Sequence, residues 1–304
     1  MRIVVTGREG QVVRALLERG NLEGHDVVAV GRPKLDLTGP AAAILAALGD
    51  ARPDVIVSAA AYTAVDKAES ERDLAFAVNA TGAGAVAHAA REIGVPIIHL
   101  STDYVFDGDR AAPYGESDPT GPRTVYGASK LAGERQVLAA QPDAVILRTA
   151  WVYSPFGANF VKTMLGLADQ REEVGVVADQ HGNPTSALDI ADGILRIAAN
   201  LLCDSDPARR GIFHMTGSGE ASWAALAQAI FAISGELGGP SAGVRPISSS
   251  SYPTAAPRPA NSRLDNSLVE RRHGIRLPDW HDALKPVVRR LVLAGSRQEE
   301  ISRK

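Results

Sequence analysis

Short apolar runs alternate with Ala- and Leu-rich amphipathic stretches over the first half of the chain. The run "RIVVT" (2–6) is short, rich in β-branched residues and followed by Gly7, which is typical of a buried strand. The same patterns predict further strands at 25–31, 54–61, 96–102 and 144–153, and helices at 11–20, 40–53, 73–94 and from about 125. Strands that alternate with helices form a parallel sheet with right-handed crossovers. The sequence therefore predicts a doubly wound, Rossmann-type α/β domain over residues 1–155.

The periodicity weakens after about residue 155. Residues 179–202 read as a loop followed by a helix, and "GIFHMTG" (211–217) reads as a late strand. We expect these segments, from about 187 to 217, to rejoin the sheet. The rest of 156–304 is predicted to be mainly a smaller, substrate-binding domain.

Residues 238–263 are rich in Gly, Pro and Ser, a composition found both in disordered linkers and in ordered loops. Several arginines, a tyrosine and an asparagine lie within it. These side chains favour an ordered loop that faces a substrate. We expect the tail, residues 297–304, to be solvated and frayed.

Composition and charge describe an ordinary globular protein of 304 residues, 45% hydrophobic and 22% charged, with a net charge of -3. This charge creates no field that attracts nucleic acid or an anionic membrane surface, so neither is an expected partner. A single cysteine, Cys203, excludes an internal disulfide and fits a reducing compartment. The first residues enter a strand at once, without the pattern of a signal peptide, and no apolar run is long enough to span a bilayer. We expect a cytoplasmic protein.

The segment "TGREGQVV" (6–13) follows the first strand and begins the first helix. Gly7 and Gly10 suit a turn whose backbone N–H groups face a pyrophosphate at a helix N-terminus. Val13 occupies the third position of the pattern, where a glycine usually serves close packing of helix on sheet. The segment predicts dinucleotide binding.

The second strand ends in "VGRPK" (30–34), without the acid that commonly holds the adenosine ribose. Arg32 and Lys34 would instead pair with a 2′-phosphate, with Gly31 beside them. The sequence therefore favours NADPH over NADH as cofactor. A plain solvated loop is the alternative. Asp36 follows closely and is expected beside the adenine.

Tyr126 and Lys130 lie four residues apart in "VYGASKLAGE" (125–134), so a helix places them on one face. A neighbouring ammonium lowers the pKa of a phenol, which can then exchange a proton with an alcohol or carbonyl oxygen. An ordinary solvated helix offers the same pair. Thr102, at the carboxyl end of a predicted strand, would add a hydroxyl that orients a carbonyl. Lys130 would also contact the nicotinamide ribose.

Seven blocks of the chain, in order, resemble the dTDP-4-dehydrorhamnose reductase family of the extended short-chain dehydrogenase/reductase superfamily. They are "AAAYTAVDKAE" (59–69), "LSTDYVFDG" (100–108), "VYGASKLAGE" (125–134), "RTAWVYS" (148–154), "NFVKTML" (159–165), "DQHGNPTSA" (179–187) and "RPANSRL" (258–264). The resemblance implies an oxidoreductase that reduces a 4-keto sugar nucleotide with NADPH or NADH. The product would be dTDP-L-rhamnose, at the last step of its biosynthesis for surface polysaccharide.

The resemblance also implies site residues. Thr102, Tyr126 and Lys130 would be catalytic. Positions expected to contact the cofactor are Gly7, Gly10, Gln11, Val12, Gly31, Arg32, Asp36, Leu37, Ala60, Ala61, Tyr62, Tyr126 and Lys130. Positions expected to contact the sugar nucleotide are Val65, Thr102, Asp103, Tyr104, Trp151, Arg258 and Asn261. Three departures from the family pattern are Val13, Ser58 where Asn is common, and Gly31 with Arg32 where some relatives carry an acid.

Other interpretations remain open at this point. Trp151 would also fit a core position, and Arg258 and Asn261 would also fit roles that hold their own loop together. The histidines lack the spacing of metal ligands, so no metal site is predicted. The alternatives for function are reduction of another 4-keto-6-deoxysugar nucleotide, or a regulatory subunit that binds NADP without chemistry. The sequence leaves the oligomeric state open, with a homodimer as one option.

Overall fold

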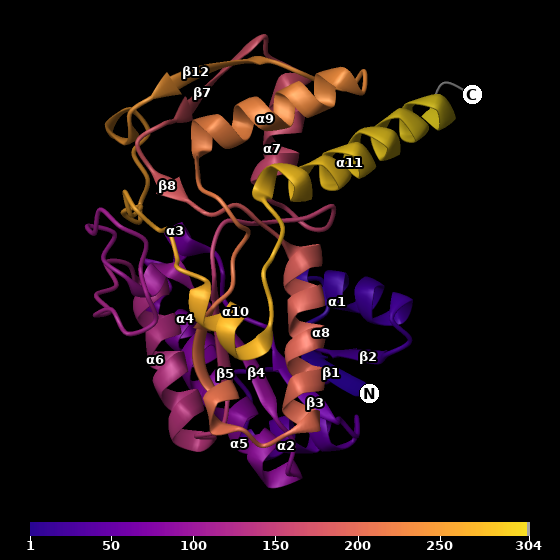
Figure 1. The fold of residues 1–304 in the computed structure, drawn as a ribbon, viewed down its shortest axis with the longest axis vertical. Coiled ribbons are helices and arrows are strands. Elements are labelled where there is room, and N and C mark those ends of the chain that lie inside the picture. The colour runs from indigo at the N-terminus through magenta and orange to yellow at the C-terminus, as the bar shows by residue number, and fades with distance from the viewer. Residues whose placement is uncertain (303–304) are drawn as a thin grey trace.

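The computed structural model describes the backbone of residues 1–302 and the side chains of residues 1–295. Its centre is a six-stranded sheet in which every neighbouring pair of strands is parallel (Figure 1). The strands in spatial order are β2 (Asp26–Val30), β1 (Arg2–Thr6), β3 (Val55–Ser58), β4 (Ile97–Thr102), β5 (Val145–Thr149) and β10 (Gly211–His214). The chain moves from β1 outward in one direction to β2 and in the other to β3, so the order reverses beside β1. The predicted Rossmann-type sheet is confirmed, and ligands bind such sheets at this reversal.

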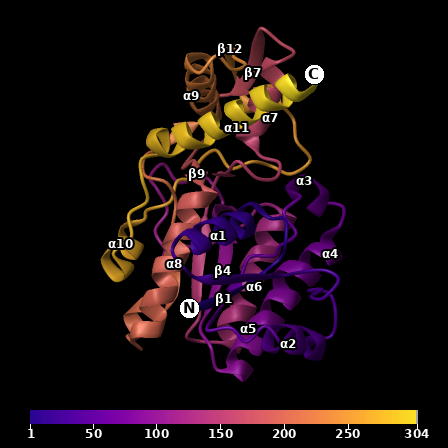
Figure 2. The same ribbon diagram turned by 90° about the vertical axis from the view of Figure 1, so that its right-hand side faces the viewer.

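Helices cover both faces of the sheet (Figure 2). One face carries α1 (Gln11–Leu22) and α8 (Ala187–Cys203). The other carries α2 (Ala41–Gly49), α5 (Ala83–Ile93) and α6 (Val125–Ala140). In α8 the residues Ile190, Ile194 and Ile197 follow helical spacing and are fully buried against the sheet.

The stretch predicted as one helix over 73–94 is interrupted. It consists of α4 (Arg72–Phe76), a π-helical turn (Ala77–Gly82) and α5. Asn79 lies in the wider turn, and its side-chain amide donates to the Tyr62 carbonyl (3.0 Å) and the Ser129 hydroxyl (2.9 Å). The turn thereby joins the loop after β3 to α6.

The second part of the chain packs around a core of its own above the sheet (Figure 1). Its elements are α7 (Phe160–Ala168), β7 (Glu173–Val177), α9 (Trp223–Glu236), β12 (Gly243–Ile247) and α11 (Trp280–Ser302). Strands β12 and β7 pair in parallel, so part of the stretch interpreted as a loop over 238–263 is a strand. The tail predicted to be frayed, residues 297–304, lies partly outside the described residues, and its described backbone, residues 297–302, continues α11.

Short elements connect the two parts. They are α3 (Val65–Ala68), α10 (Ser267–His273) and the strand pairs β6 (Val152–Tyr153) with β9 (Thr185–Ser186) and β8 (His181–Gly182) with β11 (Ala221–Ser222). The strand predicted over 144–153 is therefore two strands, β5 and β6. The chain turns between them at Trp151, whose φ of 47° lies in the left-handed region.

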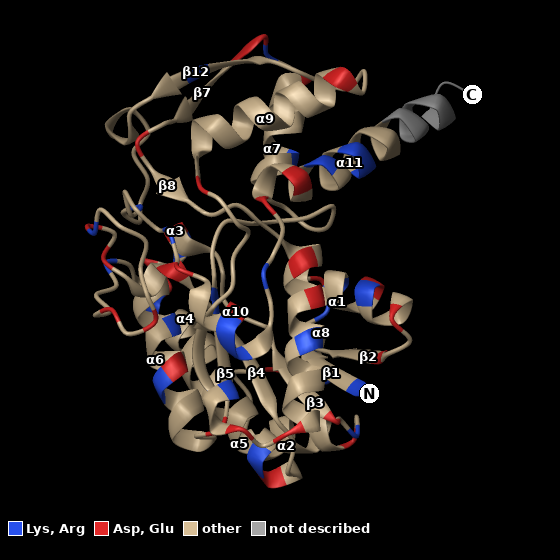
Figure 3. Cartoon of the chain, in the orientation of Figure 1, with Lys and Arg blue, Asp and Glu red and all other residues tan. Residues whose placement is uncertain are grey.

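Acidic and basic side chains are interspersed over both parts (Figure 3). No helix within residues 1–302 combines the length and the apolar character needed to cross a bilayer.

Candidate active site

The carboxyl end of β4 and the first turns of α6 meet at one edge of the sheet. Thr102 is the last residue of β4, and its hydroxyl accepts a hydrogen bond from the Tyr104 N–H (3.2 Å), which caps the short turn Asp103–Val105. Tyr126 lies in the first turn of α6, with its ring centroid 5.5 Å from that of Tyr104 in an edge-on contact. Lys130 follows one turn later on the same helix.

Local sequence explains this close approach. The Thr124 hydroxyl accepts a hydrogen bond from the Gly127 N–H (2.9 Å) and so fixes the start of α6. A Cβ atom on Gly127 would lie 2.2 Å from the Tyr104 carbonyl oxygen, a backbone atom that cannot move aside. Only glycine lets the helix come this near, so Gly127 sets the separation between Tyr126 and the end of β4.

The pKa values of Tyr126 and Lys130 differ from what their shared helix face predicts. Burial raises the pKa of Tyr126 above its ordinary value, although the nearby Thr102 hydroxyl opposes the rise. Lys130 is only 3% exposed, and its Nζ donates to the Leu100 carbonyl (2.6 Å). Burial lowers the pKa of Lys130 to about 8. The prediction that Lys130 lowers the pKa of Tyr126 is therefore not met, because the amine is directed to the strand.

Asp103 is 4% exposed, and its Oδ1 accepts a hydrogen bond from the Thr102 hydroxyl (2.8 Å). The other carboxyl oxygen, Oδ2, has no hydrogen-bond partner among the described residues. Burial raises the pKa of Asp103 to about 6, although the hydrogen bond from Thr102 opposes the rise. A carboxyl group with such a pKa binds and releases protons near neutral pH.

The glycine turn after β1 fits a dinucleotide pyrophosphate. Gly7 has a φ of 103°, which glycine adopts without strain, and Gly10 precedes α1 with no side chain capping the helix. The first N–H groups of α1 are therefore available to an anion. Val13 is accommodated because its side chain packs beneath the two glycines, 3.3 Å from where a Gly7 Cβ would lie.

Basic side chains gather beside this turn. Arg32 and Lys34 are exposed just after β2, and Gly31 packs against Gly7. The structure adds Arg8, which the sequence interpretation did not select, and whose Nη1 donates to the Arg32 carbonyl (3.3 Å). A 2′-phosphate at the end of β2 would meet these cations. The cofactor site is therefore compatible with NADPH.

Asp36 and Leu37, expected to contact the cofactor, have local roles. The Asp36 carboxylate accepts from the Thr38 N–H (2.9 Å) and hydroxyl (2.8 Å), which lowers its pKa. Leu37 is buried.

The other positions expected to contact the cofactor lie around the ends of β1 and β3. Ala60 donates its N–H to the Thr6 hydroxyl (3.0 Å), and Ala61 follows it. The Tyr62 hydroxyl donates to Glu71 (2.6 Å), which raises the pKa of Tyr62 to about 12. Gln11 and Val12 begin α1.

The Gln11 side chain joins the start of α1 to the segment that leads into the second part. Its Oε1 accepts from the hydroxyl of Ser154 (2.8 Å) and the amide of Asn159 (3.1 Å). Its Nε2 donates to the Val152 carbonyl (3.3 Å). These contacts leave the backbone of the glycine turn as the surface that faces a cofactor.

A pocket of about 620 Å³ lies beside this edge of the sheet, between the two parts of the chain. Trp151 and Trp223 form one wall, stacked with ring centroids 3.5 Å apart and planes 5° apart. The Trp151 indole N–H donates to the Ser262 hydroxyl (3.0 Å). Trp223 begins α9 and was not predicted, since nothing in the sequence near it indicates a pocket. Tyr104 lines the pocket, and its ring also contacts that of Tyr126.

Two arginines also line the pocket, Arg171 and Arg258. The Nη2 of Arg258 donates to the carboxylate of Asp66 (2.7 Å), while its buried Nη1 has no partner among the described residues. Asp66 also accepts the Ala256 N–H (3.0 Å). A phosphate group bound in the pocket would satisfy the free guanidinium N–H groups.

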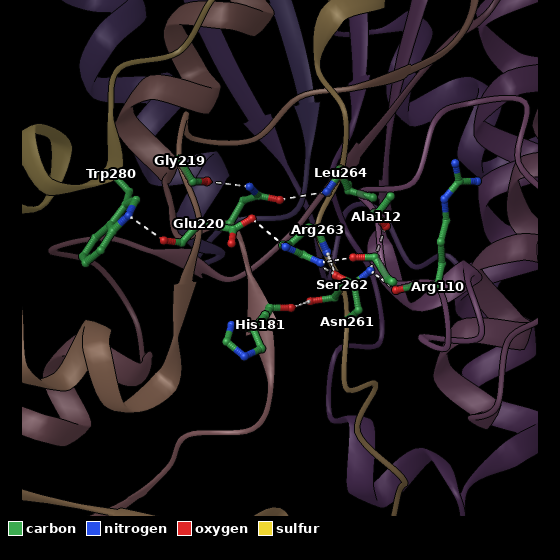
Figure 4. A network of polar contacts seen from close by, with 12 residues as sticks. Arg110, Ala112, His181, Gly219, Glu220, Asn261, Ser262, Arg263, Leu264 and Trp280 are labelled. Atoms are coloured by element: carbon green, nitrogen blue, oxygen red, sulfur yellow. Dashed lines mark hydrogen bonds and ion pairs between the residues drawn. The ribbon is translucent and has the colours of Figure 1, made fainter.

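Four predicted substrate residues lie outside the pocket lining: Val65, Thr102, Asp103 and Asn261. Val65 begins α3, immediately before Asp66. Asn261 points to the loop of residues 107–116, where its amide donates to the carbonyls of Arg110 (2.6 Å) and Ala112 (2.9 Å) (Figure 4). Its Oδ1 accepts from Arg263. The Asn261 side chain thus holds two loops together.

The family model described as RmlD substrate binding domain matches residues 1–293. The chain belongs to this family. The family resemblance inferred from seven sequence blocks is therefore confirmed, and it extends over almost the whole length. Within residues 1–295, no group of three or more His, Cys, Asp or Glu side chains is arranged to hold a metal ion.

Relatives of this RmlD-family chain carry specific names. The dTDP-4-dehydrorhamnose reductase of Sinorhizobium fredii (strain NBRC 101917 / NGR234) is 52% identical, over 97% of this chain and 99% of its own. A Streptomyces antibioticus protein named probable dTDP-4,6-dihydroxy-2-methyloxan-3-one 4-ketoreductase is 40% identical, over 94% of each chain. The crystal structure of dTDP-4-dehydrorhamnose reductase from Bacillus anthracis str. Ames in complex with NADP is 37% identical. It covers 94% of this chain and 98% of its own, with a TM-score of 0.86.

Proposed function

We propose that this chain reduces the C4 keto group of dTDP-4-dehydrorhamnose to give dTDP-L-rhamnose, with NADPH as the preferred reductant and NADH as an alternative. The observation that carries the proposal is the position of Tyr126. This phenol is held beside the Thr102 hydroxyl at the edge of the sheet, with a pocket for a sugar nucleotide on one side. The glycine turn and its arginines supply the matching cofactor surface.

Thr102 and Tyr126 have complementary roles in this proposal. Their hydroxyl groups bind the C4 carbonyl oxygen and orient it. When bound, NADPH supplies the hydride to C4. Tyr126 donates its proton to the oxygen as negative charge develops there. The raised pKa of Tyr126 suits a donor, because the phenol is fully protonated at neutral pH before the reaction. We assign Lys130 to contact with the nicotinamide ribose.

In this proposal the two parts of the chain bind different molecules. We assign the cofactor to residues 1–155, completed by 187–217, and most of the substrate pocket to residues 156–304. Trp151 and Trp223 supply flat apolar surface, and Arg171 and Arg258 supply cations for the diphosphate. We include Asp103, Tyr104 and Val65 among the groups near the sugar. Exposed Cys203 fits action in the reducing cytoplasm.

Reduction of another 4-keto-6-deoxysugar nucleotide is the second candidate. The name of the relative from Streptomyces antibioticus favours it, since that protein is similar over 94% of its length. Both reactions use the same proton donor and differ in the face and substituents of the sugar. The product's stereochemistry distinguishes them.

The test is a coupled assay in which upstream enzymes generate the 4-keto-L-sugar nucleotide and NADPH oxidation is followed by absorbance. We expect dTDP-L-rhamnose by NMR. A different epimer would support the second candidate, and tight NADPH binding without oxidation would contradict both. Tyr126→Phe should lower turnover by about 10²–10⁴-fold and leave the Kd for NADPH unchanged. Equal turnover in Tyr126→Phe would contradict the proton-donor role.

A further inference from the structure

Trp151 holds a backbone conformation that tryptophan rarely adopts. Its φ of 47° lies in the left-handed region, where a bulky side chain is strained. Such strain persists only where surrounding contacts fix it, and it is concentrated at functional sites. Here the Trp151 carbonyl accepts the Thr185 N–H (3.1 Å), and the indole N–H donates to the Ser262 hydroxyl (3.0 Å). The strained turn therefore holds in place a side chain that lines the pocket.

Three segments that are distant in the sequence meet around this indole. Strand β8 is the middle one and pairs with β11. Its His181 also donates an N–H to, and accepts one from, the segment 260–262 (2.8 Å each; Figure 4). Trp223 directly follows β11 and stacks on the indole, while Ser262 accepts the indole N–H. The two partners of the Trp151 ring are thus supplied by the two neighbours of β8.

Strand β8 is tied to both of these neighbours. The Asn183 side chain, directly after β8, accepts the Leu264 N–H (2.8 Å) and donates to the Gly219 carbonyl (2.6 Å). Asn183 is only 6% exposed, so these hydrogen bonds are shielded from water. Arg263 and Glu220 join the two outer segments by an ion pair (2.8 Å; Figure 4). The backbone of β8 is therefore fixed beside the indole.

Gly182, the second residue of β8, packs against the indole without lining the pocket. A Cβ atom at this position would lie 2.5 Å from the indole Nε1 of Trp151 and 2.8 Å from the Ser262 hydroxyl oxygen. Non-bonded atoms make favourable contact only at about 3.5–4.0 Å. The φ of Gly182 lies outside the left-handed region, so it is the lack of space that requires glycine here. Because β8 is fixed, a side chain at this position would displace the indole and not the strand.

We propose that Gly182 is a positioning residue for the sugar nucleotide, an inference that rests on the proposed function. Its missing side chain lets the Trp151 indole lie against β8, stacked on Trp223, as a wall of the pocket. Gly182 acts through Trp151, because the atoms nearest to its missing side chain belong to Trp151 and Ser262. Its effect is therefore on binding of the ligand and not on the transfer of hydride or proton.

Gly182→Ala tests this role by adding one methyl group against the indole. We expect the Kd for dTDP-L-rhamnose, measured by calorimetry, and the KM for the 4-keto sugar nucleotide to rise about 3–10-fold, the effect of losing an aromatic contact. The kcat and the Kd for NADPH should not change, because the lost contact binds substrate and transition state alike. Wild-type values of Kd and KM would overturn the inference, as would a lowered kcat at constant KM.

Trp151→Leu supplies the comparison that separates positioning from a general loss of packing. Leucine has no atom in the place of Nε1, so the methyl group of alanine has room beside it. Gly182→Ala added to Trp151→Leu should therefore leave the Kd for dTDP-L-rhamnose as it is in Trp151→Leu alone. An equal rise in both backgrounds would overturn the inference, because the glycine would then act without the indole.

Gly243→Ala is the matched control. Gly243 also lies in a strand of the second part of the chain, β12, but a Cβ atom there would be 3.5 Å from the Glu172 carbonyl oxygen, an ordinary contact. We expect wild-type Kd and KM from this variant. A rise equal to that of Gly182→Ala would contradict a specific role for Gly182.

The position of the indole is also measurable without any ligand. The near-UV circular dichroism of tryptophan depends on fixed packing, so Gly182→Ala should change this spectrum and keep the far-UV spectrum. An unchanged near-UV spectrum would overturn the inference. If Gly182→Ala does not fold, the double variant with Trp151→Leu decides. A folded double variant supports the clash with the indole, and an unfolded one overturns it.

Failure of the proposed function gives a different result. In that case the wild-type chain neither binds dTDP-L-rhamnose nor oxidises NADPH with the 4-keto sugar nucleotide. The near-UV spectra of Gly182→Ala and Gly243→Ala still show whether Gly182 positions the indole.

Discussion

Glu134 and Arg148 form a bidentate ion pair in which each side chain is only 2% exposed. The Arg148 Nε lies 2.9 Å from Oε1 and Nη2 lies 2.7 Å from Oε2, and the Ser101 hydroxyl donates to the same carboxylate. Glu134 is on α6, four residues after Lys130, while Arg148 is on β5 and Ser101 directly precedes Thr102. The pair therefore ties the helix that carries Tyr126 to the two strands beneath it.

Removing one member of this pair should lower the free energy of unfolding far more than removing both. Glu134→Gln leaves the Arg148 charge buried and unpaired, and we expect the free energy of unfolding to fall by about 3–5 kcal/mol. The double variant Glu134→Leu with Arg148→Met removes both charges and should recover much of that loss. Urea unfolding measures all three. The exposed pair Arg245 and Glu173 provides the control, where Glu173→Gln should cost under about 1 kcal/mol. A double variant less stable than Glu134→Gln would contradict this account.

The arginines beside the glycine turn should determine the choice between NADPH and NADH. Arg8→Glu and Arg32→Glu each replace a cation with an anion where we place the 2′-phosphate. We expect the Kd for NADPH to rise about tenfold or more, with little change for NADH, because charge-assisted hydrogen bonds are lost. Cofactor fluorescence titration measures both constants. Arg91→Glu, on the far side of the sheet, is the control. An unchanged ratio of the two Kd values in both variants would remove the physical basis for NADPH preference.

Trp223 should contribute to binding of the sugar nucleotide and not of the cofactor. Trp223→Ala removes one partner of the stacked pair and half of an aromatic wall. We expect KM for the sugar nucleotide to rise about 3–10-fold, while the Kd for NADPH stays constant. Trp223→Phe should lose less, since it keeps a flat ring against Trp151. The assignment fails if the alanine and phenylalanine variants have the wild-type KM.

Buried histidines should make the protein lose stability in mild acid. Burial lowers the pKa of His214 to about 3 and of His273 to about 4, and it holds the pKa of His99 well below its usual range. The unfolded chain therefore binds more protons than the folded chain as pH falls from about 6.5. Stability is lost over that range, by about 1.4 kcal/mol per pH unit for each such group.

His214→Asn tests this, because an amide can still donate to the Tyr114 carbonyl that the ring nitrogen contacts at 3.0 Å. In His214→Asn, the slope of the free energy of unfolding against pH should be smaller by about 1.4 kcal/mol per pH unit, which is the contribution of one such histidine. His88→Asn, at an exposed position, should leave the slope unchanged. Parallel slopes for wild type and His214→Asn would show that His214 titrates normally in the fold.

The sheet was predictable because its strands are short apolar runs, rich in β-branched residues, that alternate with Ala- and Leu-rich stretches of helical pattern. Gly7 was predictable because a turn follows the first strand, and its φ of 103° there suits glycine. The π-helical turn at 77–82 was not, because its residues follow the same helical pattern as their neighbours. Nor was the break at Trp151, since tryptophan gives no sign of a left-handed φ.

The residues of the site also fall into those that the sequence predicts and those that it does not. The common face of Tyr126 and Lys130 follows from helix geometry, but the direction of the Lys130 amine depends on the Leu100 carbonyl, which belongs to another element. Trp223 approaches Trp151 only after the second part of the chain has folded back over the sheet. Asn261 was expected in the pocket because it lies in a family motif. Its amide instead donates hydrogen bonds to two loop carbonyls. Local sequence patterns do not show which distant segments of the chain will come into contact.

The position of α8 and β10 has a consequence for synthesis of the protein. These elements complete one face and one edge of the sheet, yet α8 begins only at Ala187 and β10 at Gly211, whereas β5 ends at Thr149. A ribosome that has released only β1 to β5 exposes a nascent chain with an apolar face uncovered and a strand edge unpaired. Such a chain is vulnerable to aggregation until residues up to about His214 have emerged. Slow translation over α7 to α9 would prolong that interval, so the demand for chaperone protection should be greatest there.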